Sequence, residues 1–245
     1  MKSPSLPLKL IISSGILILS TLATSAENLT LSYQKPAIKW SETLPIGNGR
    51  IGAMVFGGPA QEHVQLAEET LWTGGPHTYD NPEAFSHLAS VRKLVRNEHY
   101  SEAEELAEKM MGLPLYQAAY QPLGDLFLTF SDSQKPTNYR RELDLGNAVA
   151  TVSYQVGVAQ FKRTIFASYP DDAIVIQLDC DQPGLLTFDL SLTSPHPIKA
   201  KASANDGLLV EGQVAVRKKS TESGAKALIA AWDQPGTKFA AQTKI

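Results

Sequence analysis

The sequence predicts a mainly β fold, an antiparallel sandwich or meander interrupted by a short two-helix insertion. From residue 125 onward, short runs of alternating apolar and polar residues recur at intervals of about ten residues, with Gly, Pro, Asp or Asn between them. Residues 81–114 instead show a helical spacing of apolar residues with helix start and stop signals. We therefore expect one β domain with a single helical insertion.

Residues 1–26 have the pattern of a signal peptide. Lys2 and Lys9 precede an apolar run at residues 10–19, and the small residues 24–26 follow it. The run contains two serines and a glycine and is short for a membrane span, which disfavours the alternative of an uncleaved anchor. We expect cleavage after these residues, export to the periplasm or the extracellular space, and no stable membrane insertion.

The charge and the cysteine content exclude several partners and sites. Removal of residues 1–26 takes away two lysines and no acids, so the net charge changes from −3 to −5. This mildly acidic balance gives no electrostatic reason to expect nucleic acid or an anionic membrane as a partner. Cys180 is the single cysteine, which excludes an internal disulfide and a zinc site built from cysteines. Its place at a predicted strand end indicates a packing role.

The first predicted strands surround a glycine-rich turn. Residues 29–33 alternate as in a half-buried strand, and residues 51–56 and 62–68 are expected to pair as a hairpin. The turn at residues 47–50 reads Gly-Asn-Gly-Arg, and both Gly and Asn tolerate positive φ angles. Two interpretations of this turn remain open. It is a β-turn whose only role is to start the next strand, or its backbone amides are free to meet a ligand or another domain. Trp40 is expected to cover one side of the turn.

Two helices form the predicted insertion. The first begins at Asn81, a capping residue that Pro82 and Glu83 follow. The second begins at Ser101, where Glu104 completes the spacing of a capping box. The first helix is expected to bury a stripe made of Leu88, Val91, Leu94 and Val95. The acids of the second helix are expected to form a solvated face and not a cation site: Glu102, Glu104, Glu105 and Glu108.

The remaining predicted elements are strands. Alternation and turn residues predict strands at residues 125–130, 139–145, 148–154, 160–168, 173–179 and 185–192. Further strands are expected at residues 208–216 and 227–232, with an exposed charged loop at residues 217–223 between them. Residues 239–245 read as a strand in progress.

Metal, nucleotide and nucleophile chemistry find little support in the sequence. The histidines form no i, i+4 helical pair, so we expect surface or capping roles and no metal at any of them: His63, His77, His87, His99 and His196. The sequence contains no Gly-x-Ser-x-Gly elbow, Walker loop or dinucleotide fingerprint after a strand. No cofactor is expected.

Two consecutive acids beside a tryptophan are the best candidates for sugar chemistry. Sugar hydrolysis uses two carboxyl groups and sugar binding uses an aromatic face, and Glu68 and Glu69 lie close to Trp72. Consecutive residues of a strand point to opposite faces, so at most one of the two acids faces a given pocket. A structural role is equally open, because the carboxylate could bind the amides of residues 47–49 or pair with Arg50.

Five motifs along the chain carry a resemblance to a known family. They are residues 44–54 (LPIGNGRIGAM), 66–74 (LAEETLWTG), 120–126 (YQPLGDL), 139–145 (YRRELDL) and 166–172 (FASYPDD). In this order they resemble the N-terminal domain of glycoside hydrolase family 95, the inverting α-L-fucosidases. The resemblance runs from residue 29 to the end of the sequence and is strongest up to Pro195. Ala67 departs from the family, which commonly has Asn before the acid pair.

The resemblance implies the domain organisation. Residues 27–245 are expected to form the family's N-terminal antiparallel β-supersandwich, truncated at its C-terminal end, after the signal peptide at residues 1–26. In intact relatives, a helical linker and an (α/α)6 barrel follow, and the barrel holds the catalytic acid and the base system. One carboxylic acid then protonates the leaving oxygen while a second group positions water. No part of this sequence matches the barrel motifs, so no catalytic residue is assigned.

Two classes of function remain open. The first is the N-terminal region of an exported fucosidase-like hydrolase, which walls the sugar pocket and is inactive without the missing barrel. The second is a free-standing carbohydrate-binding or surface interaction module. In either case the expected ligand is a fucosylated glycan or another plant or host oligosaccharide. The predicted substrate-binding residues are Asn48, Arg50, Glu69 and Trp72.

Overall fold

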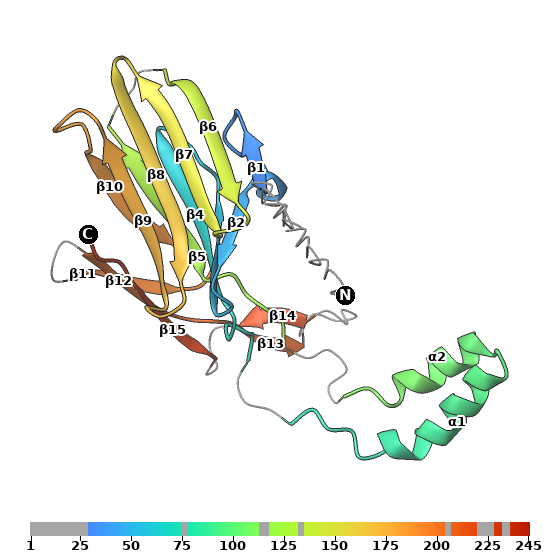
Figure 1. The fold of residues 1–245 in the computed structure, drawn as a ribbon. Coiled ribbons are helices and arrows are strands. Elements are labelled where there is room, and N and C mark those ends of the chain that lie inside the picture. Colours follow the sequence, from blue (N-terminus) through green and yellow to red (C-terminus); the bar gives the residue numbers. More distant parts are fainter. Residues whose placement is uncertain are drawn as a thin grey trace, which may run out of the picture.

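Two antiparallel five-stranded sheets pack face to face in the computed structural model (Figure 1). A three-stranded sheet and a two-stranded ribbon lie at one end of this sandwich, and a helical hairpin extends beyond them. The mainly β prediction is therefore confirmed. The structure describes residues 29–74, 78–112, 118–131, 135–203, 207–219, 228–231 and 236–245.

The first sheet has the strand order β1-β6-β7-β8-β9. Its strands are β1 (Thr30–Tyr33), β6 (Thr137–Asp144), β7 (Val149–Val156), β8 (Ala159–Ser168) and β9 (Ala173–Cys180). Alternation places one set of side chains inside, as in β7, where Ala150, Val152 and Tyr154 are buried. β1 is an edge strand with every residue exposed, so the prediction of a half-buried strand is wrong there.

The second sheet has the order β10-β5-β4-β3-β2. Its strands are β2 (Leu44–Gly47), β3 (Ile51–Val55), β4 (Gln61–Glu68), β5 (Gly124–Phe130) and β10 (Phe188–Thr193). The predicted hairpin is confirmed, because β3 pairs with β4 from Ile51 opposite Glu68 to Val55 opposite Val64. Aliphatic residues from both sheets form the core between them, among them Leu44, Val55, Val64 and Ile165.

A buried charged pair crosses this core. Arg163 from β8 donates to the Glu62 carboxylate of β4 over 2.8 Å and also to the hydroxyl of Tyr154 over 2.8 Å. Glu62 accepts a further bond from the Gly57 amide at 2.7 Å. Burial raises the pKa of Glu62, and the Arg163 guanidinium opposes this shift. The pair therefore fixes the position of one sheet relative to the other.

A smaller sheet has the order β11-β12-β15, and a ribbon joins β13 to β14. The strands are β11 (Ile198–Ser203), β12 (Gly207–Gln213), β13 (Val216–Lys219), β14 (Leu228–Ala231) and β15 (Lys238–Gln242). The strand predicted at residues 208–216 is thus divided between β12 and β13. The charged residues 217–219 pair with β14, so the prediction of a loop is wrong for them, and residues 220–223 lie outside the described residues.

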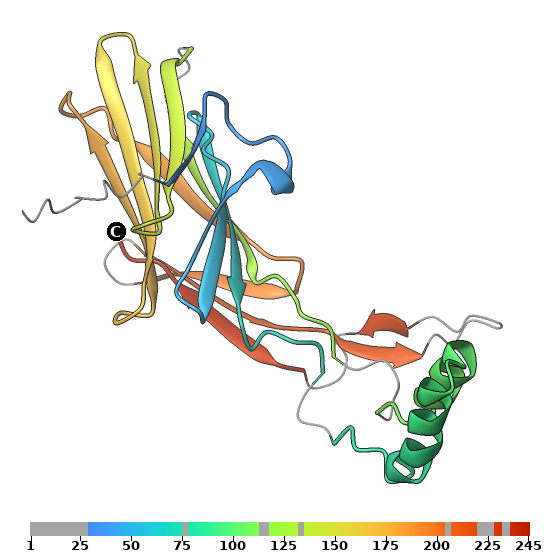
Figure 2. The ribbon, with the colours of Figure 1, turned by 45° about the vertical axis from the view of Figure 1, so that its right-hand side comes forward.

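The two helices, α1 (Ala84–Arg96) and α2 (Tyr100–Glu108), form a hairpin that lies apart from the sandwich (Figures 1 and 2). The Asn81 side chain accepts a bond from the Glu83 amide and donates to the Lys109 and Met111 carbonyls, which ties the start of α1 to the end of α2. No α1 residue is fully buried, and Val95 of the predicted stripe is exposed.

The predicted start of α2 is wrong. The helix begins at Tyr100, and its N-cap residue is His99, whose ring lies 2.8 Å from Glu102. Ser101 therefore falls inside the first turn, where it cannot cap the helix. The acids of α2 are exposed, as predicted.

Residues 1–28, on which the signal-peptide prediction falls, lie outside the described residues. In the described part of the chain, neither helix has the length and apolar content needed to cross a membrane.

Candidate functional site

The turn between β2 and β3 is closed by its own asparagine. The Asn48 side-chain oxygen accepts from the Arg50 and Ile51 amides, both at 2.9 Å, and the Asn48 amide donates to the Ile51 carbonyl. Gly49 has φ +95°, which a residue with a β-carbon rarely adopts. The expected exposure of bare amides is therefore wrong for Asn48, because its amide is bound within the turn.

This turn docks against the turn between β8 and β9, which belongs to the other sheet. The Asn48 side-chain amide donates to the Ser168 carbonyl at 2.9 Å, and Arg50 Nη1 donates to Asp172 Oδ2 at 2.7 Å. Asp172 has φ +49°, so the backbone is bent sharply where its carboxylate meets Arg50. Asn48 and Arg50 thus join the two sheets at one end of the sandwich.

Glu68 completes this polar cluster. Its carboxylate lies 3.4 Å from Arg50 Nε and accepts bonds from the Thr70 amide and hydroxyl at 2.9 and 2.6 Å. The structural alternative, a pair with Arg50, is therefore found for Glu68. Glu69 is exposed; its amide donates to the Arg50 carbonyl, and its own carbonyl accepts from Trp72 Nε1 at 2.8 Å. Of the two carboxylates, only that of Glu68, the last residue of β4, contacts the Arg50 guanidinium, while Glu69 lies in the turn that follows.

An aromatic pair adjoins the cluster. Trp72 and Tyr120 form an isolated antiparallel bridge, and their rings meet edge to face with 5.4 Å between centroids. The side chains keep much of their surface free, since Trp72 is 44% exposed and Tyr120 45%. Partial burial raises the pKa of Tyr120, and the charges of Glu68 and Glu69 raise it further. The pair and the two acids therefore share one surface.

Trp40 does not belong to this surface. It lies in the short 3-10 helix η1 (Trp40–Glu42) before β2, whereas the glycine turn follows β2. A four-residue strand spans about 13 Å, so Trp40 and the turn lie at opposite ends of it. The expectation that Trp40 covers the turn is wrong.

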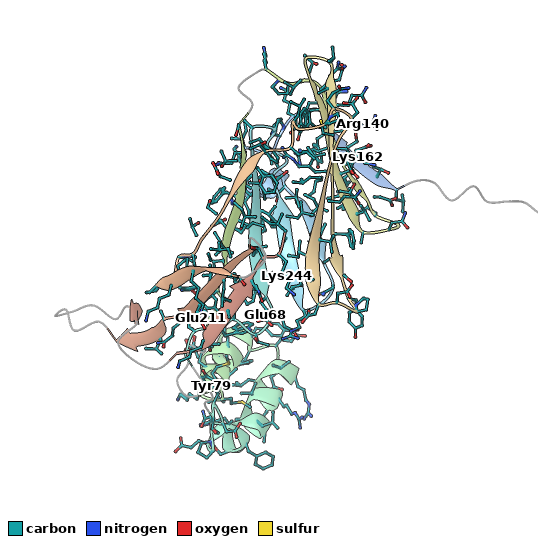
Figure 3. The ribbon with its side chains drawn as sticks, turned by 90° about the vertical axis from the view of Figure 1, so that its left-hand side faces the viewer. Glu68, Tyr79, Arg140, Lys162, Glu211 and Lys244 are labelled. Atoms are coloured by element: carbon teal, nitrogen blue, oxygen red, sulfur yellow. The ribbon has the colours of Figure 1, made fainter. Side chains whose placement is uncertain are left out.

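A cavity of about 1040 Å³ lies beside the cluster. Its polar lining includes Arg50, Glu68, Thr70 and Asp172, while aliphatic side chains of β5, β9 and β10 supply much of the remainder. The C-terminal residues 237–245 also line it, and Figure 3 shows Glu68 and Lys244 at the end of the sandwich nearest the helices. The mixed lining suits a ligand with both polar and apolar faces.

The histidines occupy unrelated places. His63 stacks between Phe56 and Phe127 and lies 2.6 Å from Asp125, whereas His196 is buried, so the expected surface or capping role is wrong for His196. His77 lies outside the described residues. Among the residues with described positions, no three His, Cys, Asp or Glu side chains gather in a way that could hold a metal ion.

Sequence reasoning had assigned no role to Asp172, Ser168 or Tyr120. All three lie in motifs that carried the family resemblance, but their contacts join residues far apart in the chain, such as Arg50 and Asp172. The Tyr-Pro-Asp-Asp sequence at residues 169–172 is a turn signal that could have indicated a special backbone position there.

The fold and this corner define an antiparallel β-sandwich domain with an aromatic and polar surface at one end. The chain belongs to the family described as glycosyl hydrolase family 65, N-terminal domain, which matches residues 31–245. The fold therefore accords with the resemblance to N-terminal domains of fucosidases.

Three relatives carry fucosidase names. The chain is 42% identical over 186 residues to "Alpha-L-fucosidase 2" of Arabidopsis thaliana, which covers 74% of this chain and 22% of that protein. It is 33% identical over 159 residues to "Probable alpha-fucosidase A" of Aspergillus niger, covering 62% of the chain and 20% of the relative. A protein of the same name from Aspergillus oryzae is 28% identical over 170 residues, covering 67% and 23%. The chain thus spans about a fifth of the length of these relatives.

Proposed function

We propose that this chain is the N-terminal domain of an exported α-L-fucosidase-like hydrolase, and that its Asn48–Trp72 corner walls the site for a fucosylated glycan. The observation that carries the proposal is the half-exposed Trp72–Tyr120 pair beside the cluster of Arg50, Glu68 and Asp172. The relatives named α-fucosidase support the choice of sugar.

The chemistry of this corner fits a deoxysugar. An indole or phenol ring packs against the C–H face and methyl group of fucose, whereas guanidinium and carboxylate groups bind its hydroxyls. Arg50 keeps a 61% exposed side chain although it contacts both Glu68 and Asp172. Those two acids hold the guanidinium in one orientation, so little freedom is lost when a hydroxyl binds.

The corner binds the sugar and does not itself cleave it. Inverting hydrolysis needs a carboxylic acid and a base about 6.5–9.5 Å apart on opposite sides of the sugar. Glu68 is engaged by Arg50 and by Thr70, which suits a carboxylate that positions other groups. We therefore assign proton transfer and water activation to the part of the relatives that this chain does not match.

The test is Trp72→Ala in the full-length protein that carries this domain. Loss of the ring should raise KM for fucosides by about 2- to 10-fold, the equivalent of an aromatic contact of roughly 0.5–1.5 kcal/mol, with a smaller effect on kcat. Trp40→Ala is the matched control, because Trp40 is also exposed and lies at the far end of β2. Unchanged kinetics together with unchanged melting of the Trp72 variant would contradict the proposal.

A free-standing binding module is the second candidate, favoured by the fact that both rings of the pair come from this chain. Isothermal titration of the isolated chain with fucosylated oligosaccharides separates the two. Binding that Trp72→Ala abolishes and Trp40→Ala preserves supports the module. A change of KM in the long protein without binding by the isolated chain supports the pocket wall.

Export is part of the same proposal and rests on the signal-peptide pattern of residues 1–26. N-terminal sequencing of the protein recovered from the periplasm or the medium should then begin at Glu27. Recovery from the cytoplasm with Met1 retained would contradict it.

A further inference from the structure

His196 braces the segment that runs from Tyr120 to the start of β5. The imidazole is 5% exposed, and its Nε2 lies 3.1 Å from the Pro122 carbonyl. A carbonyl only accepts, so Nε2 bears the proton and donates it. The other ring nitrogen, Nδ1, is buried and accepts no hydrogen bond from any residue that the structure describes. The ring also meets Phe239 of β15 edge on.

The bond from His196 is one of two that residues 194–196 make to this segment. The Ser194 hydroxyl donates to the Leu123 carbonyl at 2.7 Å and accepts from the His196 amide at 3.2 Å. Residues 194–196 thus bind two successive carbonyls just after Tyr120. Gln121 in turn donates to the Leu71 carbonyl at 2.8 Å, and Trp72 bridges Tyr120. Residues 120–123, which include Tyr120 of the aromatic pair, are therefore held between residues 71–73 and residues 194–196.

A proton added to His196 would lack a partner. Burial lowers the pKa of His196, with the Pro122 carbonyl opposing the shift. No ion pair joins its ring to an acid among the described residues. Two other titratable groups lie on the segments that pack against His196. Lys238 precedes Phe239 in β15 and is exposed. Tyr120 lies close enough to Glu68 and Glu69 for their charges to raise its pKa.

We propose that His196 is a pH-sensitive positioning residue for the Trp72–Tyr120 pair. The neutral ring donates to Pro122 and holds residues 120–123 in place. A protonated ring keeps this donor, but it adds a charge and an unpartnered Nδ1–H in a buried position, which favours arrangements of residues 120–123 that expose the ring to water. Binding of fucosylated glycans at this corner therefore weakens in acid. This inference rests on the proposed function for its glycan readout, while its structural readout is independent of it.

The sign follows from the lowered pKa. Between the folded-state pKa and about 6.5, the unfolded chain binds more protons at His196 than the folded chain does. Above about pH 6.5, His196 therefore does not reduce the free energy of unfolding. That free energy falls as the pH drops from about 6.5 to the folded-state pKa. The corner should respond over the same range.

The test follows Trp72 fluorescence in a Trp40→Phe, Trp232→Phe background between pH 8 and 5. We expect a titration step below about pH 6.5 that His196→Gln removes, because the Gln amide can donate to Pro122 and does not titrate. His99→Gln is the matched control, since His99 is exposed and lies on the helical hairpin. The step should survive in the control. A step that persists in His196→Gln, or that is missing from the parent, overturns the proposal.

Two further measurements keep the outcome clear. If His196→Gln fails to fold, the NMR titration of the His196 ring protons decides, and a pKa at or above the ordinary histidine value of about 6.5 overturns the proposal. Binding of a fucosylated trisaccharide should weaken about threefold from pH 7.5 to 5.5 in the parent and stay constant in His196→Gln. A fluorescence step that His196→Gln removes, without any change in glycan binding, supports the positioning role and contradicts the proposed sugar site.

Discussion

Arg163 and Glu62 form an ion pair of 2.8 Å whose side chains are 2% and 0% exposed, between the two sheets of the sandwich. The guanidinium also reaches the carbonyls of Gly58 and Pro59, and its carbon lies 4.3 Å from the centre of the Phe130 ring. The charged groups are thus surrounded by partners. Such a pair contributes little stability beyond what apolar residues would. Its role is therefore to fix the position of β4 relative to β8, which belong to different sheets.

Arg163→Ala should destabilise the domain by roughly 3–5 kcal/mol, because it leaves the Glu62 carboxylate buried without its partner. Chemical denaturation measures the loss. Arg140→Ala is the control: its pair with Glu142 is exposed, so the expected change is below about 1 kcal/mol. Adding Glu62→Gln to Arg163→Ala should recover part of the loss. Equal effects of the two arginine substitutions would show that the buried pair is not structurally special.

Gly124→Ala should disturb the pairing of β5 with β10. A β-carbon at this position would lie 2.1 Å from the Thr193 carbonyl oxygen, and a backbone atom cannot move aside as a side chain can. We expect a loss of at least about 2 kcal/mol in the free energy of unfolding. Gly52→Ala is the matched control, since its nearest neighbour would be at 3.4 Å. A melting temperature of Gly124→Ala equal to that of the control is the result that contradicts this reading.

Asp172→Asn tests the contact between the two turns. Asn tolerates the same positive φ and keeps the shape of the side chain, so the substitution removes mainly the charge that faces Arg50. The pair is partly exposed, and stability should change by less than about 1 kcal/mol. Under the proposed function, KM for fucosides in a full-length protein that carries this domain should rise about two- to fivefold, because Arg50 loses its fixed orientation. Asp171→Asn, which leaves Arg50 untouched, should keep KM unchanged, and a matching rise there would contradict the role given to Asp172.

Local patterns were sufficient for most of the strands. The β3–β4 hairpin follows from alternation on both sides of a turn, and its register pairs Val55 with Val64 as the shared apolar face requires. The β13 strand was missed because Arg217 and its two lysine neighbours look like a loop, and charge does not reveal that the backbone pairs with β14. The Ser101 capping box failed because the N-cap of α2 is His99, two residues before Ser101.

The candidate site was only partly predictable, because its decisive contacts are long-range. Sequence reasoning identified the glycine turn and Trp72, and it left open whether an acid would pair with Arg50. The partner from the other sheet, Asp172, lies 122 positions along the chain from Arg50. Tyr120 also gave no signal of its own, since it meets Trp72 only after the helical insertion has returned to the sandwich.

The same bridge determines how the helical hairpin is attached. The chain leaves the sandwich just after Trp72 and returns just before Tyr120, so the two ends of the insertion are adjacent and hydrogen-bonded to each other. We therefore expect that a change in the length of this segment leaves the pairing of β4 with β5, the strands on either side of it, unchanged. The length and sequence of the helical hairpin can therefore vary while the Trp72–Tyr120 pair at its base keeps its position.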